Sequence, residues 1–491
     1  MLKRISLLMA AALFLAFMPV SCDQPEPETP QQEQETPEDE TPGDEKPEEE
    51  VPQEEPAKLQ AVKGSVPVSN NWIFDKKPLL ELNMENPNEV ATKVEVKAVF
   101  TTDKGEKVTT VTDSVAVLAS SEKGHLIETD SDLTPGFYKV RISINNKTVR
   151  SFGFGVSPFE VISEPDMQDD FSTYWEDAKT QLASIDMNPV LVEIPSKSSS
   201  TRKVYFVEMQ SVPNGLSGEP VIIRGFYCQP QDGKKHPVLM HYFGWDDRGG
   251  AVTVPSGGSS NYAEFYLSTR GQYHNNRAAA YEKVEAWIKE HGEWVAKDPC
   301  TYASISNPSD KYNWFGFNFG DKDSFYYRGA FMDCVQAIRF MAEQPTSDMT
   351  NLFAEGSSQG GAFTYAAAAL SDYPFVAIAP NVAFLGDFPD YFDIVSWPGD
   401  VAKRNKGSMS DDEMYAFLSY FDTKNLATRI SCAVHASSGL QDGTCPPHTN
   451  FAPYNNLNTT DKVMIIAPEM GHSYPSGWES SWRKFFEERM K

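Results

Sequence analysis

The chain has 491 residues, with 23% charged residues and a formal net charge of −26. This length allows two to four domains and a large hydrophobic core. Lys and Arg are nowhere clustered enough to indicate nucleic-acid binding, so that class of function is excluded. More than half of the net negative charge lies in one short segment near the N-terminus, so the acidity is no evidence for a basic ligand.

Residues 1–22 have the pattern of an export signal. Lys3 and Arg4 precede an apolar run at 5–18, which is too short to span a membrane comfortably. Cys22 stands where bacterial lipoproteins carry their lipidated cysteine, although Pro19 occupies the usual leucine position of that motif. We therefore expect Cys22 to be lipidated. The alternative is ordinary cleavage after Ser21, which leaves Cys22 free.

Residues 23–57 are predicted to form a disordered tether. They contain fifteen Asp or Glu, one Lys and eight Pro, a net charge of −14. Such a segment cannot bury a core and repels itself, so it extends up to about 100 Å. Asp23, Glu26 and Glu28 resemble the surface-export signal of Bacteroidetes lipoproteins. We expect the lipid to anchor the chain in the outer membrane, facing outwards.

Residues 58–158 are predicted to form a β-sandwich domain. Apolar and polar residues alternate at 94–100 and at 138–144, and Asn145-Asn146-Lys147 provides a turn before the next strand. Alternation of this kind with Asn-rich turns is typical of half-buried antiparallel sheets. No catalytic constellation is present. We interpret the domain as a spacer, with glycan binding as the alternative.

Residues 159–491 are predicted to form an α/β-hydrolase domain with a mostly parallel sheet and helices on both faces. Strands are expected at 237–243, 352–354 and 462–467, and helices at 277–291, 328–344 and 362–370. Strands that alternate with helices indicate a parallel sheet. Ligands of such sheets bind beyond the carboxyl ends of the strands, so chemistry is expected in the loops that follow strands.

One such loop, Gly356-Ser357-Ser358-Gln359-Gly360, matches the G-x-S-x-G pattern of a nucleophile elbow. The turn from strand to helix holds Ser358 in a strained conformation, and a Cβ at Gly356 or Gly360 would collide with its neighbours. Ser357 is at the wrong offset. The alternative is an ordinary strand–helix turn rich in glycine.

A serine hydroxyl needs a base, and the order in this fold is Ser, acid, His. His435 lies in an apolar strand-like run and is interpreted as structural, and His448 is only six residues past the best acid. His472 follows the strand at 462–467 and is the preferred base. Asp442 follows the preceding strand, thirty residues before His472, and is the preferred acid, with an ordinary Asp-Gly turn as the alternative. The main-chain N–H groups of Gln359 and Trp245 are the candidate oxyanion donors.

Taken together, these motifs resemble the acetyl xylan esterase/cephalosporin C deacetylase family over roughly 160–490. The resemblance rests on four stretches: Arg270-Gly271-Gln272, Phe325-Tyr326-Tyr327-Arg328-Gly329, the elbow with Gly361, and Gly439-Leu440-Gln441-Asp442 with Cys445-Pro446-Pro447. It implies a triad of Ser358, Asp442 and His472, and an oxyanion donor at Trp245, where the family usually has tyrosine.

Two departures from the family pattern affect the supporting residues. Ser473 follows the histidine where the family has glutamate, and Tyr273 follows Gln272 where the family has glycine. Arg270 and Gln272 are therefore supporting residues by resemblance alone. Family members are often hexamers, but the N-terminal β domain and the stalk can block that assembly, so the oligomeric state stays open.

The sequence therefore predicts a serine esterase that removes acetyl groups from xylan or other glycans without a cofactor or metal. The alternatives are an esterase for larger acyl groups such as feruloyl, a peptidase, and a non-catalytic glycan-binding lipoprotein. Several aromatic residues are candidates for the walls of a small pocket or for the core, namely Trp245, Tyr273, Trp314 and Phe315. The five cysteines after Cys22 have no metal-ligand spacing and allow at most two disulfides.

Overall fold

The computed structural model describes residues 59–245, 255, 261–270, 272 and 313–491. Residues 59–491 form one compact unit, in which an all-β region is followed by an α/β region. Cys22, the 23–57 segment, Tyr273, the helix predicted at 277–291 and Cys300 lie outside the described residues, as does the side chain of Trp314. Among the helices that are described, none has the length and apolar character needed to cross a membrane.

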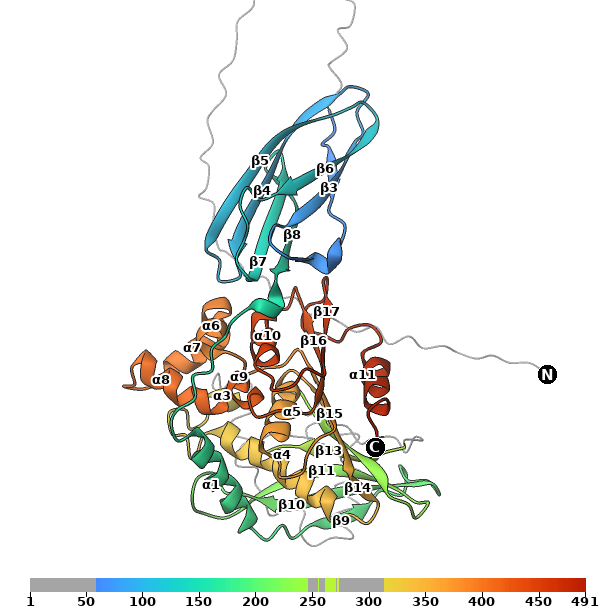
Figure 1. Ribbon diagram of the computed structural model, residues 1–491, viewed down its shortest axis with the longest axis vertical. Helices are drawn as coiled ribbons and strands as arrows, with labels where there is room; N and C mark the ends of the chain where they lie inside the picture. Colours follow the sequence, from blue (N-terminus) through green and yellow to red (C-terminus); the bar gives the residue numbers. More distant parts are fainter. Residues whose placement is uncertain (1–58, 246–254, 256–260, 271, 273–312) are drawn as a thin grey trace, which may run out of the picture. The chain divides into compact units, whose positions relative to one another are not determined.

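The all-β region contains two sheets (Figure 1). The strand order is β1-β3-β6 in the first sheet and β2-β8-β7-β4-β5 in the second. The strands are β1 (Lys63–Ser65), β2 (Ile73–Phe74), β3 (Leu79–Asn86), β4 (Thr92–Thr102), β5 (Lys107–Val117), β6 (Ser121–Glu128), β7 (Gly136–Ile144) and β8 (Lys147–Val156), with short 3-10 turns η1 (Asn70–Trp72) and η2 (Pro158–Glu160).

Alternation along these strands builds the core between the two sheets. In β4, Val94, Val96 and Ala98 are buried, whereas Lys93 before them and Glu95 between the two valines are exposed. The β7–β8 hairpin turns at Asn145 and Asn146, whose φ angles are 47° and 62°. Asparagine tolerates this left-handed region, which two-residue hairpin turns require.

The α/β region is built on a nine-stranded sheet, with strand order β17-β16-β15-β14-β12-β13-β11-β10-β9 among the described residues. Pairing is parallel from β13 through β12 to β17 and antiparallel from β13 to β9. The strands are β9 (Val190–Glu193), β10 (Arg202–Ser211), β11 (Val221–Pro230), β12 (His236–Tyr242), β13 (Ala263–Ser268), β14 (Ser347–Ser357), β15 (Ala377–Asn381), β16 (Ala433–Gly439) and β17 (Lys462–Ala467).

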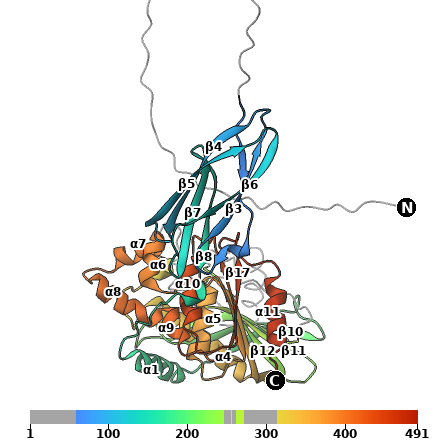
Figure 2. The same ribbon diagram turned by 45° about the horizontal axis from the view of Figure 1, so that its top comes forward.

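Helices cover both faces of this sheet, as Figure 2 shows. Leu352 and Ala354 of β14 point into one core with α4 and α5, whereas Phe353 between them packs against α11. The helices are α1 (Phe171–Ala183), α3 (Asn313–Gly316), α4 (Tyr326–Ala342), α5 (Gln359–Leu370), α6 (Phe388–Ile394), α7 (Ser396–Asn405), α8 (Asp411–Leu418), α9 (Thr423–Ala427), α10 (Pro447–Asn455) and α11 (Trp478–Glu487), with a 3-10 turn η4 (Ser419–Phe421).

Two predicted elements extend further than their apolar residues indicate. Strand β14 begins at Ser347, five residues before the predicted strand, because its polar start pairs with His236 and Pro237 of β12. Helix α5 begins at Gln359, immediately after Ser358, three residues before the predicted helix. Ser358 is thus the single residue between the end of β14 at Ser357 and the start of α5.

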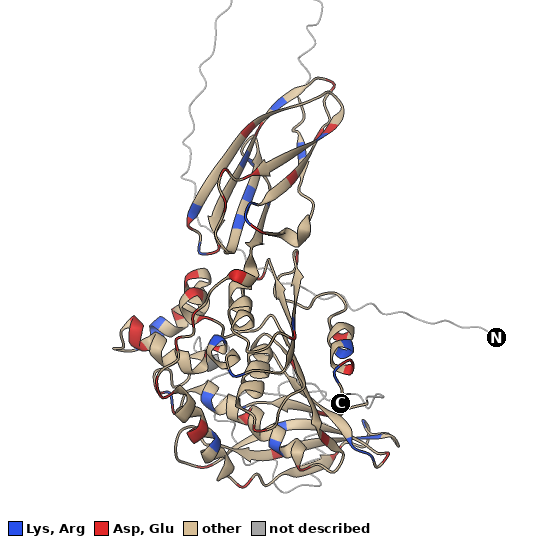
Figure 3. Ribbon diagram, viewed as in Figure 1, with Lys and Arg blue, Asp and Glu red and all other residues tan. Residues whose placement is uncertain are grey.

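The two regions share a core. Leu440 and Phe451 of the α/β region pack into the buried cluster of the all-β region. Gln441 bonds the main chain of Gly153 in β8 with both amide atoms, at 2.8 Å and 3.0 Å. Basic and acidic residues are interspersed along the described ribbon of both regions (Figure 3).

Candidate active site

The turn between β14 and α5 has the geometry of a nucleophile elbow. Ser358 has φ 58° and ψ −121°, a conformation that costs about 1–3 kcal/mol for a residue with a side chain. A Cβ on Gly356 would lie 2.3 Å from the carbonyl oxygen of Gly360, and one on Gly360 would lie 2.3 Å from that of Tyr242. Both glycines are therefore required by close main-chain packing, as the motif predicts.

Ser358, His472 and Asp442 form one hydrogen-bonded chain. The Ser358 Oγ lies 2.9 Å from Nε2 of His472, and Nδ1 of His472 lies 2.8 Å from Oδ2 of Asp442. A carboxylate only accepts hydrogen bonds, so Nδ1 donates and Nε2 is left to accept from the serine hydroxyl. The structure thus brings the three predicted residues together, although 114 residues separate the serine from the histidine.

The loop after β16 fixes the carboxylate of Asp442. Its Oδ1 accepts from the main-chain N–H groups of Thr444 and Cys445 at 2.8 Å and 2.9 Å, and its side chain is fully buried. The side chain of His472 is 28% exposed. The acid is therefore held rigidly inside the protein, while the base reaches the surface where a substrate arrives.

Neither of the other two histidines after Ser358 joins this chain. His435 lies buried in β16, stacks on Trp478 and bonds Ser481 at 2.9 Å. Burial and the positive charge of Arg489 lower the pKa of His435 to about 4, so its ring is neutral near neutral pH. This agrees with its interpretation as a structural residue.

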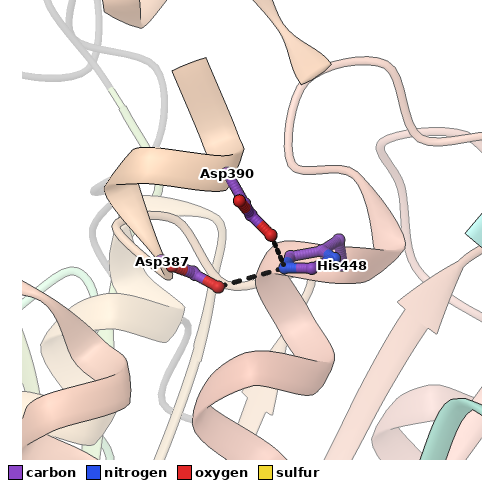
Figure 4. Close-up of side chains that lie close together, drawn as sticks. All are labelled: Asp387, Asp390 and His448. Carbon is purple, nitrogen blue, oxygen red and sulfur yellow. Dashed lines mark hydrogen bonds and ion pairs between the residues drawn. The ribbon is translucent and has the colours of Figure 1, made fainter. Parts of the chain in front are cut away.

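His448 lies in α10, where its Nε2 is 3.0 Å from both Asp387 and Asp390 (Figure 4). Burial alone would lower the pKa of His448, but the hydrogen bonds to these two carboxylates outweigh it and raise the pKa to about 9. The imidazole is therefore charged at neutral pH and unsuited to act as a base.

The donor set of this cluster, two carboxylates and an imidazole, is of a type that binds divalent metals. Each carboxylate, however, already faces a lysine. Lys424 lies 2.9 Å from Asp387, and Lys104 of the all-β region lies 2.7 Å from Asp390. With the charged His448 between them, the two carboxylates are neutralised, and we interpret the cluster as an ion-pair network.

The loop after β12 abuts the elbow. A Cβ built on Gly244 would lie 3.4 Å from the Ser357 carbonyl oxygen and 3.7 Å from the Cβ of Ser358. This contact brings the next residue, Trp245, to the nucleophile. Gln359 is the first residue of α5, where main-chain N–H groups have no acceptor within the helix. Both predicted oxyanion donors therefore belong to segments that border Ser358.

Gln272 supports the oxyanion loop directly. Its side-chain amide donates to the carbonyl oxygens of Phe243 and Gly244 at 3.1 Å and 3.0 Å. Its own carbonyl and side-chain oxygens are bonded by Ser268 and Thr269. Gln272 is thus a positioning residue for the main chain that carries the Trp245 N–H.

Arg270 has a structural role and does not support the oxyanion loop directly. Its guanidinium and its main-chain N–H bond the buried carboxylate of Asp333 in α4, at 2.6 to 3.0 Å. A Cβ on Gly329 would lie 2.2 Å from this guanidinium, which explains the glycine in that motif. Tyr326 donates to the Arg270 carbonyl oxygen at 2.8 Å. The two motifs around 270 and 325–329 therefore pack together in a single buried, hydrogen-bonded contact.

Sequence reasoning missed three residues that organise the site. Asp333 is the one acidic residue in the α4 helix, and that isolation is a signal for a buried ion pair. Asn381, at the end of β15, bonds Ser357, the Ser473 carbonyl oxygen and Ser437, and so connects the elbow, the histidine loop and β16. Gln441 connects the acid loop to β8. Nothing local in the sequence marks the last two.

An aromatic cluster is attached to the elbow through Phe384. The main-chain N–H of Phe384 donates to the Ser358 carbonyl oxygen at 3.0 Å. Its ring stacks on Trp397 with centroids 5.5 Å apart, and Trp245 contacts both rings at 6.4 Å. Phe315, the remaining described candidate, is fully buried in the core. Phe384, Trp397 and Trp245 thus form a connected aromatic cluster in segments that contact the elbow.

Residues 160–489 match the family model for acetyl xylan esterase (AXE1). The chain belongs to the acetyl xylan esterase family. The matched segment begins after the last strand of the all-β region, so that region lies outside the family match.

Similar proteins agree with this family. The chain is 26% identical to the acetyl esterase Axe7A of Xylanibacter ruminicola over 339 residues, which cover 69% of this chain and 71% of that protein. The acetyl xylan esterase from Paenibacillus sp. R4 superposes with a TM-score of 0.54 and 24% identity, and acetyl xylan esterase 1 from Thermoanaerobacterium sp. with 0.52 and 22%. Each covers 68% of this chain and 98% of its own.

Membership of the acetyl xylan esterase family confirms the predicted fold class and the predicted chemistry. The protein is a serine esterase that removes acetyl groups, and the hydrogen-bonded Ser358, His472 and Asp442 are consistent with that reaction. The individual roles of these residues remain predictions from the motif.

Proposed function

We propose that this protein deacetylates xylan or related plant glycans through an acyl-enzyme intermediate on Ser358. The observation that carries the proposal is the chain of hydrogen bonds from Ser358 through His472 to Asp442, in a member of the acetyl xylan esterase family. The substrates named for the relatives, acetylated xylan and acetyl esters, are the class that we transfer to this chain.

In the first half-reaction, His472 takes the proton from the Ser358 hydroxyl through Nε2 as the oxygen attacks the acetyl carbonyl carbon. Asp442 accepts from Nδ1 and stabilises the imidazolium that forms. The main-chain N–H groups of Gln359 and Trp245 bind the developing oxyanion, and each such donor contributes about 100- to 1000-fold in rate. His472 then protonates the departing sugar oxygen, which leaves acetyl-Ser358.

In the second half-reaction, water replaces the sugar. His472 removes a proton from the water as its oxygen attacks the acetyl carbonyl, and the collapse of the tetrahedral intermediate returns the proton to Ser358 and releases acetate. The 28% exposure of the His472 side chain is compatible with the entry of that water. Every proton is moved by His472, so the cycle needs no second general acid or base.

The rings of Trp245, Phe384 and Trp397 support a preference for short acyl groups. Phe384 is bonded to Ser358 through its main chain, and its ring packs with those of Trp397 and Trp245, so a larger acyl pocket on this side of the elbow would disturb a connected aromatic cluster. We therefore expect hydrolysis to fall steeply beyond propionyl. A preference for feruloyl or other large acyl groups would overturn the acetyl assignment in favour of the larger-acyl alternative.

The test is acetate release from acetylated xylan, mannan and pectin fragments, followed by mass spectrometry. Wild-type protein is expected to lower the mass of at least one of these glycans by about 42 Da (C2H2O) for each ester hydrolysed, whereas Ser358→Ala leaves the masses unchanged. A series of p-nitrophenyl esters from acetyl to decanoyl measures the acyl preference. Glycan binding without any ester hydrolysis would favour a non-catalytic role instead.

We also propose that the protein is a lipid-anchored, outward-facing protein of the outer membrane. The support is the sequence at Cys22 and the acidic segment that follows it. Metabolic labelling with a palmitate analogue should mark the wild type but not Cys22→Ala. External protease should remove the protein from intact cells. Release of the unlabelled wild-type protein into the medium would contradict the anchor.

A further inference from the structure

A cleft of about 410 Å3 lies where the all-β region meets the loop that carries Asp442. Lys139 of β7 and Ser151 of β8 line one side, and residues 394–396, from the end of α6 to the start of α7, line the other. The acid loop, from Leu440 to Gly443 with Pro446 and Pro447, lines the remainder. The volume is in the range of small-molecule sites, about 300–1,000 Å3.

The walls of this cleft are fixed to one another. Both amide atoms of Gln441 bond the main chain of Gly153, and the carbonyl oxygen of Leu440 approaches so closely that a Cβ on Gly153 would lie 2.5 Å from it. Leu440 and Phe451 also pack into the core of the all-β region. A ligand therefore meets a preformed surface and pays little to order it.

The lining suits a sugar ring. Lys139, Ser151 and Ser396 are exposed and offer donors and acceptors to hydroxyl groups, while Ile394 and Val395 are half-buried and apolar. A pyranose has the matching surface, with apolar C–H faces and hydroxyls around its edge.

The charges of the lining favour a neutral ligand. Two acidic residues line the cleft, but the Asp442 carboxylate is fully buried and bound by His472, and Asp103 faces His448 with Oδ2 3.9 Å from Nδ1. Lys139 is then the exposed charge among the residues that line the cleft. One amine beside hydroxyl groups fits a neutral polyol better than a strongly charged ligand.

The cleft lies beside the reaction centre. Asp442 lines it and is linked to Ser358 through His472 by bonds of 2.8 Å and 2.9 Å. On the other side, Ser396 is followed by Trp397, which packs on the ring of Phe384, and the main-chain N–H of Phe384 donates to the Ser358 carbonyl oxygen. A glycan whose acetylated sugar occupies the elbow has neighbouring sugars that extend a few ångströms to either side.

From this arrangement we propose that the cleft is a glycan subsite, built jointly by the all-β region and the acid loop, for a sugar next to the acetylated one. The proposal rests on the proposed function for the identity of the substrate. It gives the all-β region a part in substrate choice, in place of the spacer role that the sequence favours.

The test compares substrates of different length in the full chain. Ser151→Trp fills the cleft, and Thr148→Trp places the same ring at an exposed position of the same strand outside it. For Ser151→Trp, the ratio of kcat/KM on acetylated xylohexaose to that on p-nitrophenyl acetate should fall about tenfold, equivalent to about 1.4 kcal/mol of lost binding. Thr148→Trp should keep the wild-type ratio. An unchanged ratio in Ser151→Trp overturns the proposal.

A second variant guards against misfolding of Ser151→Trp. The double variant Lys139→Ala/Ser396→Ala only shortens exposed side chains and should lower the same ratio. A binding measurement separates this proposal from the proposed function. Titration of Ser358→Ala with unacetylated xylohexaose should give binding heat that disappears when Ser151→Trp is added. Binding that persists, or no binding at all, overturns the subsite, whether or not the wild type releases acetate from any glycan.

Discussion

The all-β region and the α/β region build their cores by different means. In the all-β region the large sheet is dominated by neighbours in sequence, such as β4 with β5 and β7 with β8, and the alternating pattern is legible strand by strand. In the α/β region, Ser358, Asp442 and His472 come from loops after three different strands and meet only because β14, β15, β16 and β17 lie in that order.

The difference shows how each region bears on catalysis. The α/β region contributes every predicted reacting group, whereas the all-β region contacts the residue just before the acid, through Gly153 and Gln441, and supplies Lys104 to the ion-pair network around His448. The first kind of contribution is chemical and the second is positional. Substitutions in the two regions should therefore differ in the size of their effect and in the kinetic or stability parameter that they change.

The largest effect is expected at the nucleophile. Ser358→Ala should lower kcat on p-nitrophenyl acetate by at least about 10,000-fold, because no other group forms the acyl-enzyme. Ser357→Ala is the matched control. Its hydroxyl accepts from Asn381 but is at the wrong offset for attack, so this variant should stay within about tenfold of wild type. Equal losses in the two variants would contradict the assignment of the elbow serine.

A smaller effect is expected in the oxyanion loop. Gln272→Leu removes both side-chain hydrogen bonds to the carbonyl oxygens of Phe243 and Gly244. The main chain that carries the Trp245 N–H is then no longer held in position. Loss of a whole oxyanion donor costs about 100- to 1000-fold, so its displacement should lower kcat by about 10- to 100-fold with KM nearly unchanged. Gln231→Leu, at an exposed position, should have no effect. A change confined to KM would contradict a role in the transition state.

A still smaller effect on kcat is expected for substitutions at the contact between the two regions. Gly153→Ala forces β8 and the acid loop apart, because its Cβ would lie 2.5 Å from the Leu440 carbonyl oxygen. We expect kcat to fall about tenfold and the free energy of unfolding to fall by about 1–3 kcal/mol.

Gly136→Ala in β7 is the control for this variant, because its Cβ would meet only the Tyr138 ring at 3.6 Å or more. Its kcat and unfolding midpoint should match those of wild type. If Gly153→Ala loses stability but keeps its full kcat, the all-β region is attached to the acid loop without positioning it.

The smallest effect on turnover, and the clearest on pH dependence, is expected at His448. Its pKa is raised to about 9 in the folded protein, above the usual value of about 6.5. Its stabilising contribution is therefore complete below about pH 6.5 and is lost as the pH rises through about 9, a change on the order of 3 kcal/mol. Urea unfolding at pH 6 and at pH 9.5 measures this change.

His448→Gln removes the titrating group and keeps a hydrogen-bond donor. The difference in free energy of unfolding between wild type and this variant should shrink as the pH rises. Taking this difference cancels the contribution of groups that titrate in both proteins, such as Asp422. The groups that face His448 are Asp387, Asp390 and Asp103, each from a different element or turn. A difference that is constant from pH 6 to pH 9.5 would show that His448 is not charged in the folded state.

Much of the predicted site could be located from local sequence because its constraints are local. Gly356 and Gly360 flank Ser358 since main-chain atoms leave no room for a Cβ, and Asp442 and His472 each follow an apolar strand. The roles of Arg270 and Gln272 could not be separated in this way. Both belong to one three-residue motif, yet Gln272 supports the oxyanion loop and Arg270 bonds Asp333 in another element.

The residues of the chain specify its strands, its helices, the strained elbow and the types of side chain that the chemistry requires, because periodicity and steric exclusion act over a few positions. Which histidine becomes the base is a matter of long-range packing. His448 and His472 both lie within thirty residues of Asp442, but α10 turns the first towards Asp387 and Asp390, and the loop after β17 turns the second towards Ser358. The bonds between Gly153 and Gln441 likewise arise only when two regions 288 residues apart fold against each other.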